Sequence, residues 1–321
     1  MQKPSRLLLA TLALLGTSAA FAQSSVTLYG RVNTSMERQK TGDVTSTVLQ
    51  NNSSRFGFRG SEDLGGGLKA GFVLESGFNS DDGGNTQPSF FKRQSEVNLS
   101  GSFGMIRLGN FNAESELAVA DYVSMHNHDT GTSSDALYDF QRSPFVGNKI
   151  AYRTPDLGGL TVEGAVDFHE NSAAQKKNGY DLAANYNNGP LALGAGFSKF
   201  EESKQFGLRA LYSFGQFTVG GYYQRSTDVP VLGSRNAYRL AAMYALGASE
   251  FHVNVGRAAA WSQLSDSAAT QWTLAYNYNL SKRTKVYAFY TKVDDNANAD
   301  YWGAGNGVDF SSFAVGIRHN F

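Results

Sequence analysis

The sequence of 321 residues predicts an all-β protein, a transmembrane antiparallel β-barrel of sixteen strands. Three observations predict this fold. The chain starts with a segment typical of a secretory signal, and no later segment has the roughly 20 apolar residues that a membrane-spanning helix needs. Segments of about ten residues, in which apolar and polar side chains alternate, then repeat along the chain. If such a chain crosses a membrane, it does so as strands of a closed sheet.

The first 22 residues fit a cleaved signal peptide. Lys3 and Arg6 precede the apolar run Leu7–Leu15, and the tripeptide Ala-Phe-Ala at 20–22 fits the small-x-small cleavage pattern. This apolar run is too short to span a bilayer as a helix. The predicted division is therefore a signal peptide followed by one barrel domain, residues 23–321.

The composition excludes several classes of protein. Removing the signal takes away two of the 28 basic residues and none of the 28 acidic ones, which leaves a net charge of −2, so nucleic acid is not the implied partner. The chain has no cysteine, and neither disulfides nor thiol chemistry can be argued. Its 35 glycines, 22 Phe and 16 Tyr against 6 prolines suit a strand-rich chain with aromatic belts and tight turns. A soluble β-sandwich is also compatible with composition alone.

The strand segments have one apolar and one polar face. In Ser25–Arg38, Val26 and Leu28 lie on one face, and Tyr29 and Arg31 lie on the other. The same parity runs through six further segments: Leu160–Phe168, Phe206–Tyr212, Phe217–Tyr223, Tyr238–Leu246, Phe251–Val255 and Trp272–Leu280.

The connections between the predicted strands alternate in character. Seven are compact and rich in turn-forming residues: 62–67, 101–104, 155–159, 187–190, 213–216, 246–249 and 279–284. Eight others, most of them longer and more polar, lie between them: 39–53, 80–89, 111–147, 170–178, 201–204, 226–234, 258–267 and 294–307. The compact set would face the periplasm and the other set the cell exterior, because an even number of strands puts both chain ends on one side.

With these patterns the chain resembles the Gram-negative general porins. Five stretches carry the resemblance: SVTLYGRVN at 25–33, SRFGFRGSEDLGGGLKAGFVLESGF at 54–78, FKRQSEVNLSGSFGMIRLGN at 91–110, NKIAYRTPDLGGL at 148–160 and GIRHNF at 316–321. They span essentially the whole predicted mature chain. The resemblance implies a water-filled channel for passive diffusion of ions and small hydrophilic solutes, with no cofactor and no enzyme activity. It also implies a homotrimer in the outer membrane, in contact with lipid, lipopolysaccharide and the outer-membrane assembly machinery.

The carboxyl end fits this expectation. From Phe313 to Phe321 one apolar row alternates with small or polar residues up to the terminus, with His319 as an interruption. A terminal amphipathic strand suits a sheet that closes on itself, because an open sheet would leave its edge unprotected. The resemblance implies that Phe321 is the recognition signal for assembly.

The inner face of the predicted barrel is basic. Alternation assigns ten cations to it: Arg31, Arg55, Arg59, Lys69, Arg107, Lys149, Arg153, Arg209, Arg239 and Arg318. The acids assigned to it are fewer: Glu37, Glu75, Glu163, Asp167 and Asp181. A channel takes its selectivity from the charges that line its water, so this wall predicts a preference for anions. Pairing of the arginines with loop carboxylates is the alternative.

The resemblance further implies a constriction, at which wall arginines face carboxylates of the third outer loop, Phe111–Gly147, folded into the lumen. The basic candidates that the resemblance gives are Arg55, Arg93 and Arg142, and two further arginines assigned to the wall, Arg31 and Arg59, complete the set. The loop candidates are Glu114, Glu116, Asp121 and Asp129, of which Glu116 and Asp121 lie where the family's loop folds inward.

Arg93 does not follow the simple alternation. Its parity places it with Val97 and Leu99, opposite Glu96 and Asn98. A β-bulge, or packing of this strand on a neighbouring subunit, would reconcile the pattern. The resemblance implies that Arg93 points into the lumen.

Five other interpretations stand beside a general diffusion channel. His126–Asp129 contains metal-binding residue types, but two histidines in a polar loop are more often solvated, and no metal site is expected. Asp294–Asp300 resembles a calcium loop yet lacks the glycine and glutamate of an EF-hand. An outer-membrane enzyme needs a converging catalytic set, which we cannot assemble from this chain. A plugged structural barrel is disfavoured by the small inward residues Gly194, Gly196, Gly207 and Gly220, and a substrate-specific channel on the same scaffold cannot be separated by sequence.

Overall fold

The computed structural model describes residues 25–120, 123, 131–139, 147–169 and 177–321. The predicted signal peptide, residues 1–22, lies outside this range and stays a prediction. Among the described residues, no helix combines the length and the apolar character needed to cross a bilayer.

The described chain is almost entirely strand. The strands are β1 Ser25–Thr41, β2 Val44–Asn51, β3 Arg55–Gly65, β4 Leu68–Gly77, β5 Gln94–Gly101, β6 Gly104–Asn110, β7 Lys149–Arg153, β8 Leu160–Asp167, β9 Gly179–Asn188, β10 Leu191–Phe200, β11 Ser203–Phe214, β12 Phe217–Val229, β13 Gly233–Leu246, β14 Ser249–Ala258, β15 Ala269–Asn279, β16 Thr284–Asp295 and β17 Phe310–Asn320. The helical elements are α2, Glu114–Val119, and the 3-10 turn η2, Gly131–Ser133.

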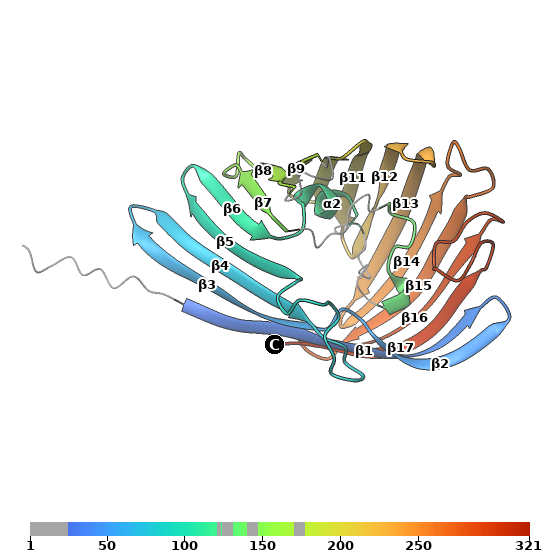
Figure 1. Ribbon diagram of the computed structural model, residues 1–321. Helices are drawn as coiled ribbons and strands as arrows, with labels where there is room; N and C mark the ends of the chain where they lie inside the picture. The colour runs from blue at the N-terminus through green and yellow to red at the C-terminus, as the bar shows by residue number, and fades with distance from the viewer. Residues whose placement is uncertain (1–24, 121–122, 124–130, 140–146, 170–176) are drawn as a thin grey trace, which may run out of the picture.

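These strands form one closed antiparallel barrel (Figure 1). Each strand pairs with its neighbour in the chain, and β1 closes the ring by pairing with β17. β1 also pairs with β2 through Thr34–Thr41 and with β3 through Ser25–Arg31, so β2 and β3 are two parts of one barrel strand. The seventeen strands therefore make a sixteen-stranded barrel, which confirms the predicted fold class.

The two faces of the wall are the reverse of those of a soluble protein. On β1, the apolar side chains Val32 and Met36 are 41% and 55% exposed, whereas Asn33 and Glu37 are fully buried. The same alternation is seen on β14, β15 and β17. An apolar exterior over a polar interior is the arrangement that a hydrocarbon surrounding and a watery bore require.

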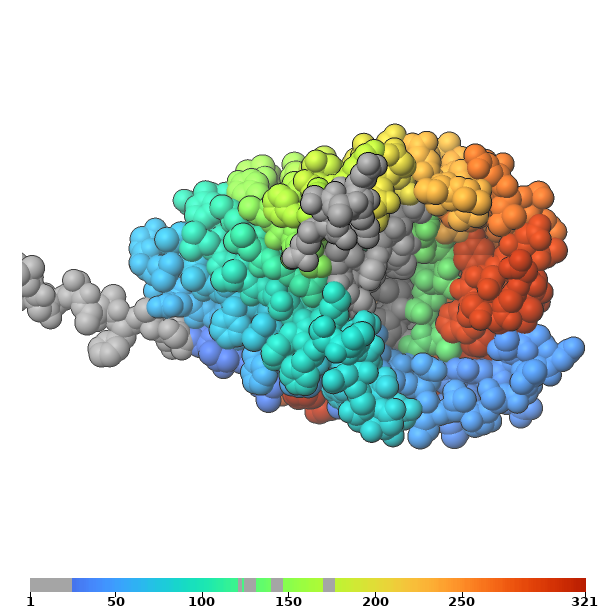
Figure 2. Space-filling view, in the orientation of Figure 1, coloured from blue at the N-terminus to red at the C-terminus, as the bar shows by residue number. Residues whose placement is uncertain are grey.

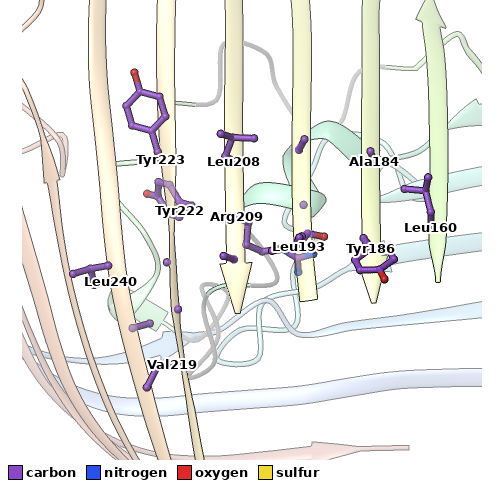
Figure 3. Close-up of a pocket in the computed structure, with 16 residues that line it drawn as sticks. Leu160, Ala184, Tyr186, Leu193, Leu208, Arg209, Val219, Tyr222, Tyr223 and Leu240 are labelled. Atoms are coloured by element: carbon purple, nitrogen blue, oxygen red, sulfur yellow. Dashed lines mark hydrogen bonds between the residues drawn. The ribbon is translucent and has the colours of Figure 1, made fainter. Parts of the chain in front are cut away.

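A shallow groove on the outer wall shows the apolar face most clearly (Figure 3). It crosses β8 to β13, with Ala184 toward one end and Leu240 at the other, and with Leu193 and Leu208 between them. Leu240 is 67% exposed and Leu208 is 46% exposed. Leaving such side chains in water costs free energy in proportion to their apolar area, so this face suits contact with lipid chains.

Two predicted outer connections are mostly strand, because in 226–234 only residues 230–232 lie outside β12 and β13, and 39–53 departs further. Residues 39–53 form most of the β1–β2 hairpin, and the chain turns only at Gly42 and Asp43. The outward row of this hairpin is polar, with Arg38 beside Thr47 and Lys40 beside Thr45, all exposed. Because the apolar row is the sequence signal for a barrel strand, a hairpin that lacks it is interpreted as a loop. The seven compact turns fall where they are predicted.

Candidate pore constriction

Arginines from neighbouring strands gather on the inner wall. Arg31 of β1 and Arg55 of β3 are direct cross-strand partners with the same inward parity. Both guanidinium groups donate to the carbonyl oxygen of Ser53, at 3.4 Å from Arg31 and 3.5 Å from Arg55. Two like charges placed opposite each other in a sheet repel, which stabilises neither strand. Packing alone does not account for such a pair, so its position indicates a functional reason for placing two cations here.

Glu75 of β4 links this pair to a third arginine. Its carboxylate lies 3.6 Å from the Nε of Arg55 and 2.8 Å from the Nε of Arg93. Both arginines keep part of their side chains exposed, 25% for Arg55 and 19% for Arg93. Arg55 and Arg93 thus share Glu75, and Arg31 joins them through Arg55 and the carbonyl oxygen of Ser53; we call these three arginines the arginine cluster.

The position of Arg93 explains its irregular parity. It precedes β5, which begins at Gln94, so strand alternation does not determine where it points. Within β5 the alternation is regular, because Glu96 is buried and Val97 is 54% exposed. Neither a bulge nor a subunit contact is needed to turn Arg93 toward Glu75.

A second group of charges is closely paired. Arg107 lies between Glu96, at 3.0 Å, and Glu163, at 3.1 Å. Arg153 binds Glu163 at 2.8 Å and Glu114 of α2 at 2.7 Å. The alternative interpretation, pairing with loop carboxylates, is correct for Arg153, which binds Glu114, whereas Arg107 pairs with carboxylates of the wall. The basic wall is therefore uneven, with compensated charge here and the arginine cluster on the β1–β5 side.

Helix α2 joins this network to the next strand of the wall, β9. Glu114 accepts a hydrogen bond from the amide of Asn185 at 2.8 Å, and Ser115 donates one to Asp181 at 2.8 Å. Burial raises the pKa of Glu114, and Arg153 opposes that rise only in part. The helix therefore rests on β9 through polar contacts with inward side chains of that strand.

The second described part of the same connection, residues 131–139, lies on the far wall. In Figure 2 this green segment is visible inside the ring of strands, beside the orange and red C-terminal strands. Asp135 forms an ion pair with Arg239 at 2.6 Å, and both side chains are almost fully buried. Tyr222 also donates to Asp135, at 2.5 Å. Burial would raise the pKa of Asp135, but Arg239 and these hydrogen bonds hold it below its usual range.

Inward glycines make room for α2. A Cβ at Gly194 would lie 2.2 Å from the carbonyl oxygen of Ala118, and one at Gly196 would lie 2.3 Å from that of Ser115. At Gly207 it would lie 2.7 Å from Val119. The prediction that small inward residues leave the lumen open is wrong for these three glycines. They are small because a loop helix packs on them.

Replacing Gly196 with alanine should disturb α2. The new methyl group would meet backbone atoms of Ser115, which cannot rotate away, so the helix must move toward the bore. We expect a lower single-channel conductance in planar bilayers. The matched control is Gly164→Ala, since the nearest atom to a Cβ there is 3.9 Å away. Equal conductance of the two variants would contradict this packing role.

The structure brings together only part of the predicted constriction. Arg31, Arg55 and Arg93 meet, whereas Arg59 is exposed and lies over the ring of Tyr29 at 5.2 Å. Glu114 pairs with Arg153, and Glu116 is buried in α2. The remaining candidates, Arg142, Asp121 and Asp129, lie outside the described residues.

Sequence reasoning missed the loop acids that contact the wall. Asp135 binds Arg239, and Asp139 lies 3.9 Å from Arg235. These two acids lie four residues apart in the second half of the connection, and no sequence pattern distinguishes them from the other acids of the loop. Arg235 was also missed, because it directly follows a segment interpreted as loop.

The weaker metal signals receive no support. The segment His126–Asp129 lies outside the described residues. In the part of the chain that the structure describes, no group of three or more metal-ligating side chains is found. In the predicted calcium-like loop, Asp295 and Asp300 accept hydrogen bonds from the backbone amides of Tyr301 and Gly305.

Known proteins share this sequence and this barrel. The family described as Gram-negative porin matches residues 9–298. Outer membrane porin protein 32 of Delftia acidovorans is 33% identical, over 98% of this chain and 99% of that protein. An outer membrane porin protein of Bordetella pertussis is 27% identical, over 98% of this chain and 99% of that protein. The solved structure of an anion-selective porin from Comamonas acidovorans has a TM-score of 0.74 and 27% identity, over 93% of this chain and all of that one.

Proposed function

This chain belongs to the Gram-negative porin family, whose members are outer-membrane channels rather than enzymes, and we propose that its pore prefers anions because of the arginine cluster. The family supplies the passive, water-filled passage for ions and small hydrophilic solutes. The preference for anions is specific to this chain, and it depends on which charges line the narrowest part of the water-filled bore.

The arginine cluster is the observation that carries the proposal. Arg55 and Arg93 share the carboxylate of Glu75, and Arg31 is the direct cross-strand partner of Arg55, so cations outnumber acids in this group. A concentration of one sign of charge beside a low-dielectric wall attracts counterions along the bore. The similar porin from Comamonas acidovorans is described as anion-selective, which supports the same sign here.

We propose in addition that α2 and residues 131–139 narrow this bore. Both segments contact inward side chains of the barrel wall, through the Glu114–Arg153 and Asp135–Arg239 ion pairs. Solutes would then pass between the third loop and the arginine cluster, with size limited by the loop and charge selected by the arginines. Among the loop residues outside the described range, Asp121 and Asp129 remain candidates for the acidic side.

A salt gradient tests the preference. With purified protein in a planar bilayer and unequal potassium chloride on the two sides, chloride should be at least about threefold more permeant than potassium, and the ratio should fall as salt screens the cluster. A reversal potential of the sign expected for potassium preference would overturn the proposal.

The same recording tests the oligomer. A porin of similar fold, OmpT of Vibrio cholerae, was solved in a trimer form. We propose that this chain also assembles as three copies in the outer membrane. Voltage-induced closure in three equal steps is the expected record, and single-step closure of every insertion would argue against it.

A further inference from the structure

A basic recess lies at the end of the barrel where the compact turns are. It has a volume of about 600 Å³ and lies between the β13–β14 turn and the β15–β16 turn. Four cations line it, namely Lys282, Arg283, Lys285 and Arg318, together with the hydroxyl groups of Ser281 and Thr284. No carboxylate is among the described residues that line this recess.

The recess is continuous with the arginine cluster along the inner wall. Lys285 of β16 and Arg318 of β17 are direct cross-strand partners. On the next strand pair, Asn320 of β17 is the partner of Arg31, which in turn is the partner of Arg55. Cations of β16, β17, β1 and β3 thus follow one another around the wall.

A neighbouring acid balances only part of this charge. Glu250 of β14 lies 3.5 Å from the Nζ of Lys285. The same carboxylate accepts hydrogen bonds from Asn277 at 2.9 Å and from Asn279 at 2.7 Å. Its oxygens are therefore engaged with strand side chains, while Lys282 and Arg283 on the turn stay exposed.

The turn itself is held in shape. Ser281 Oγ accepts hydrogen bonds from the backbone amides of Arg283 and Thr284, at 3.1 Å and 3.0 Å. These bonds fix where the chain enters β16 and hence where Lys282 and Arg283 project. A fixed turn offers its cations at a lower entropy cost than a mobile one.

We propose that this recess binds a multivalent oxyanion, of the phosphate class, as a second station for anions at the periplasmic mouth. Two guanidinium groups match the paired oxygens of a phosphate, two ammonium groups add point charge, and hydroxyl groups can donate to the remaining oxygens. A monovalent halide would interact with the positive charge alone, because it has no set of oxygens for the guanidinium and hydroxyl groups to bind. The inference rests on the proposed anion-preferring pore, because the anions must reach this mouth through it.

Inorganic phosphate is the probe. In a planar bilayer with about 0.1 M potassium chloride, where screening extends over only ~10 Å, added phosphate should lower the chloride current and saturate, since a bound oxyanion occupies the mouth. The double variant Lys282→Gln/Arg283→Gln should raise the half-blocking phosphate concentration about fivefold, because two exposed cations each contribute a modest attraction. Both residues are on an exposed turn, so the barrel should still assemble. Arg318→Gln should act in the same direction.

The matched control removes two cations elsewhere. Lys199→Gln/Arg257→Gln changes the net charge equally, at strand positions far from the recess, and should leave phosphate block unchanged. Block that does not saturate, or that is equal in Lys282→Gln/Arg283→Gln and wild type, would overturn the inference. The chloride reversal potential without phosphate is measured in the same variants. It tests the anion preference alone, so the failure of one proposal is distinguishable from failure of the other.

Discussion

Replacing Arg55 and Arg93 together with glutamine is expected to lower the chloride-to-potassium permeability ratio roughly thirtyfold, because each charge beside the bore is worth about 1 kcal/mol and two are removed. The change also leaves Glu75 without the two cations that bind it at 3.6 Å and 2.8 Å. Of the arginine cluster only Arg31 would then remain, beside the uncompensated Glu75. The reversal potential in a potassium chloride gradient measures the shift.

Two further variants sharpen this experiment. Glu75→Gln should move the ratio in the opposite direction, toward chloride, because it removes the carboxylate and keeps all three arginines. Lys199→Gln/Arg257→Gln removes as much charge at the outer ends of β10 and β14 and should change the ratio little. If both double variants shift the potential equally, net charge rather than the arginine cluster sets the selectivity.

Most of the fold was predictable from the sequence because a barrel wall repeats one simple constraint. Every strand must alternate between lipid and water, and every strand must end in a turn, so most connections could be placed by parity. The β1–β2 hairpin was the clearest exception. Residues such as Lys40 and Thr45 lie where no lipid requires an apolar row of side chains. The alternation that identifies a barrel strand in the sequence is therefore absent from this hairpin.

The candidate site was less predictable, for a related reason. Arg31 and Arg55 followed from strand parity and Arg93 from the family resemblance, but the loop has no periodicity, so nothing in the sequence indicated that Asp135 would meet Arg239 across 104 positions of chain. The glycines under α2 show the same limit. Gly196 and Gly207 were recognised as inward and small, yet only the position of the helix explains why.

Arg239→Met is expected to release the third loop from the wall. Arg239 and Asp135 are both almost fully buried, and removing one partner of such a pair leaves a charge without compensation, at a cost of roughly 3–5 kcal/mol. The neighbouring strands keep their backbone pairing, so the cost falls on residues 131–139 and the barrel remains. We expect faster cleavage of the loop by protease in folded protein, with larger and noisier single-channel currents.

The decisive comparison is between breaking the pair and replacing it. In Asp135→Asn/Arg239→Gln no charge is buried, and an amide at each position can still form a hydrogen bond, so the double variant should lose less than Arg239→Met. Lys204→Met, which breaks the exposed Lys204–Asp228 pair, should leave the loop as resistant as in wild type. Should Arg239→Met resist protease equally well, residues 131–139 would be held by their apolar contacts, chiefly Leu137 and Tyr138, and the ion pair would serve only to neutralise Arg239.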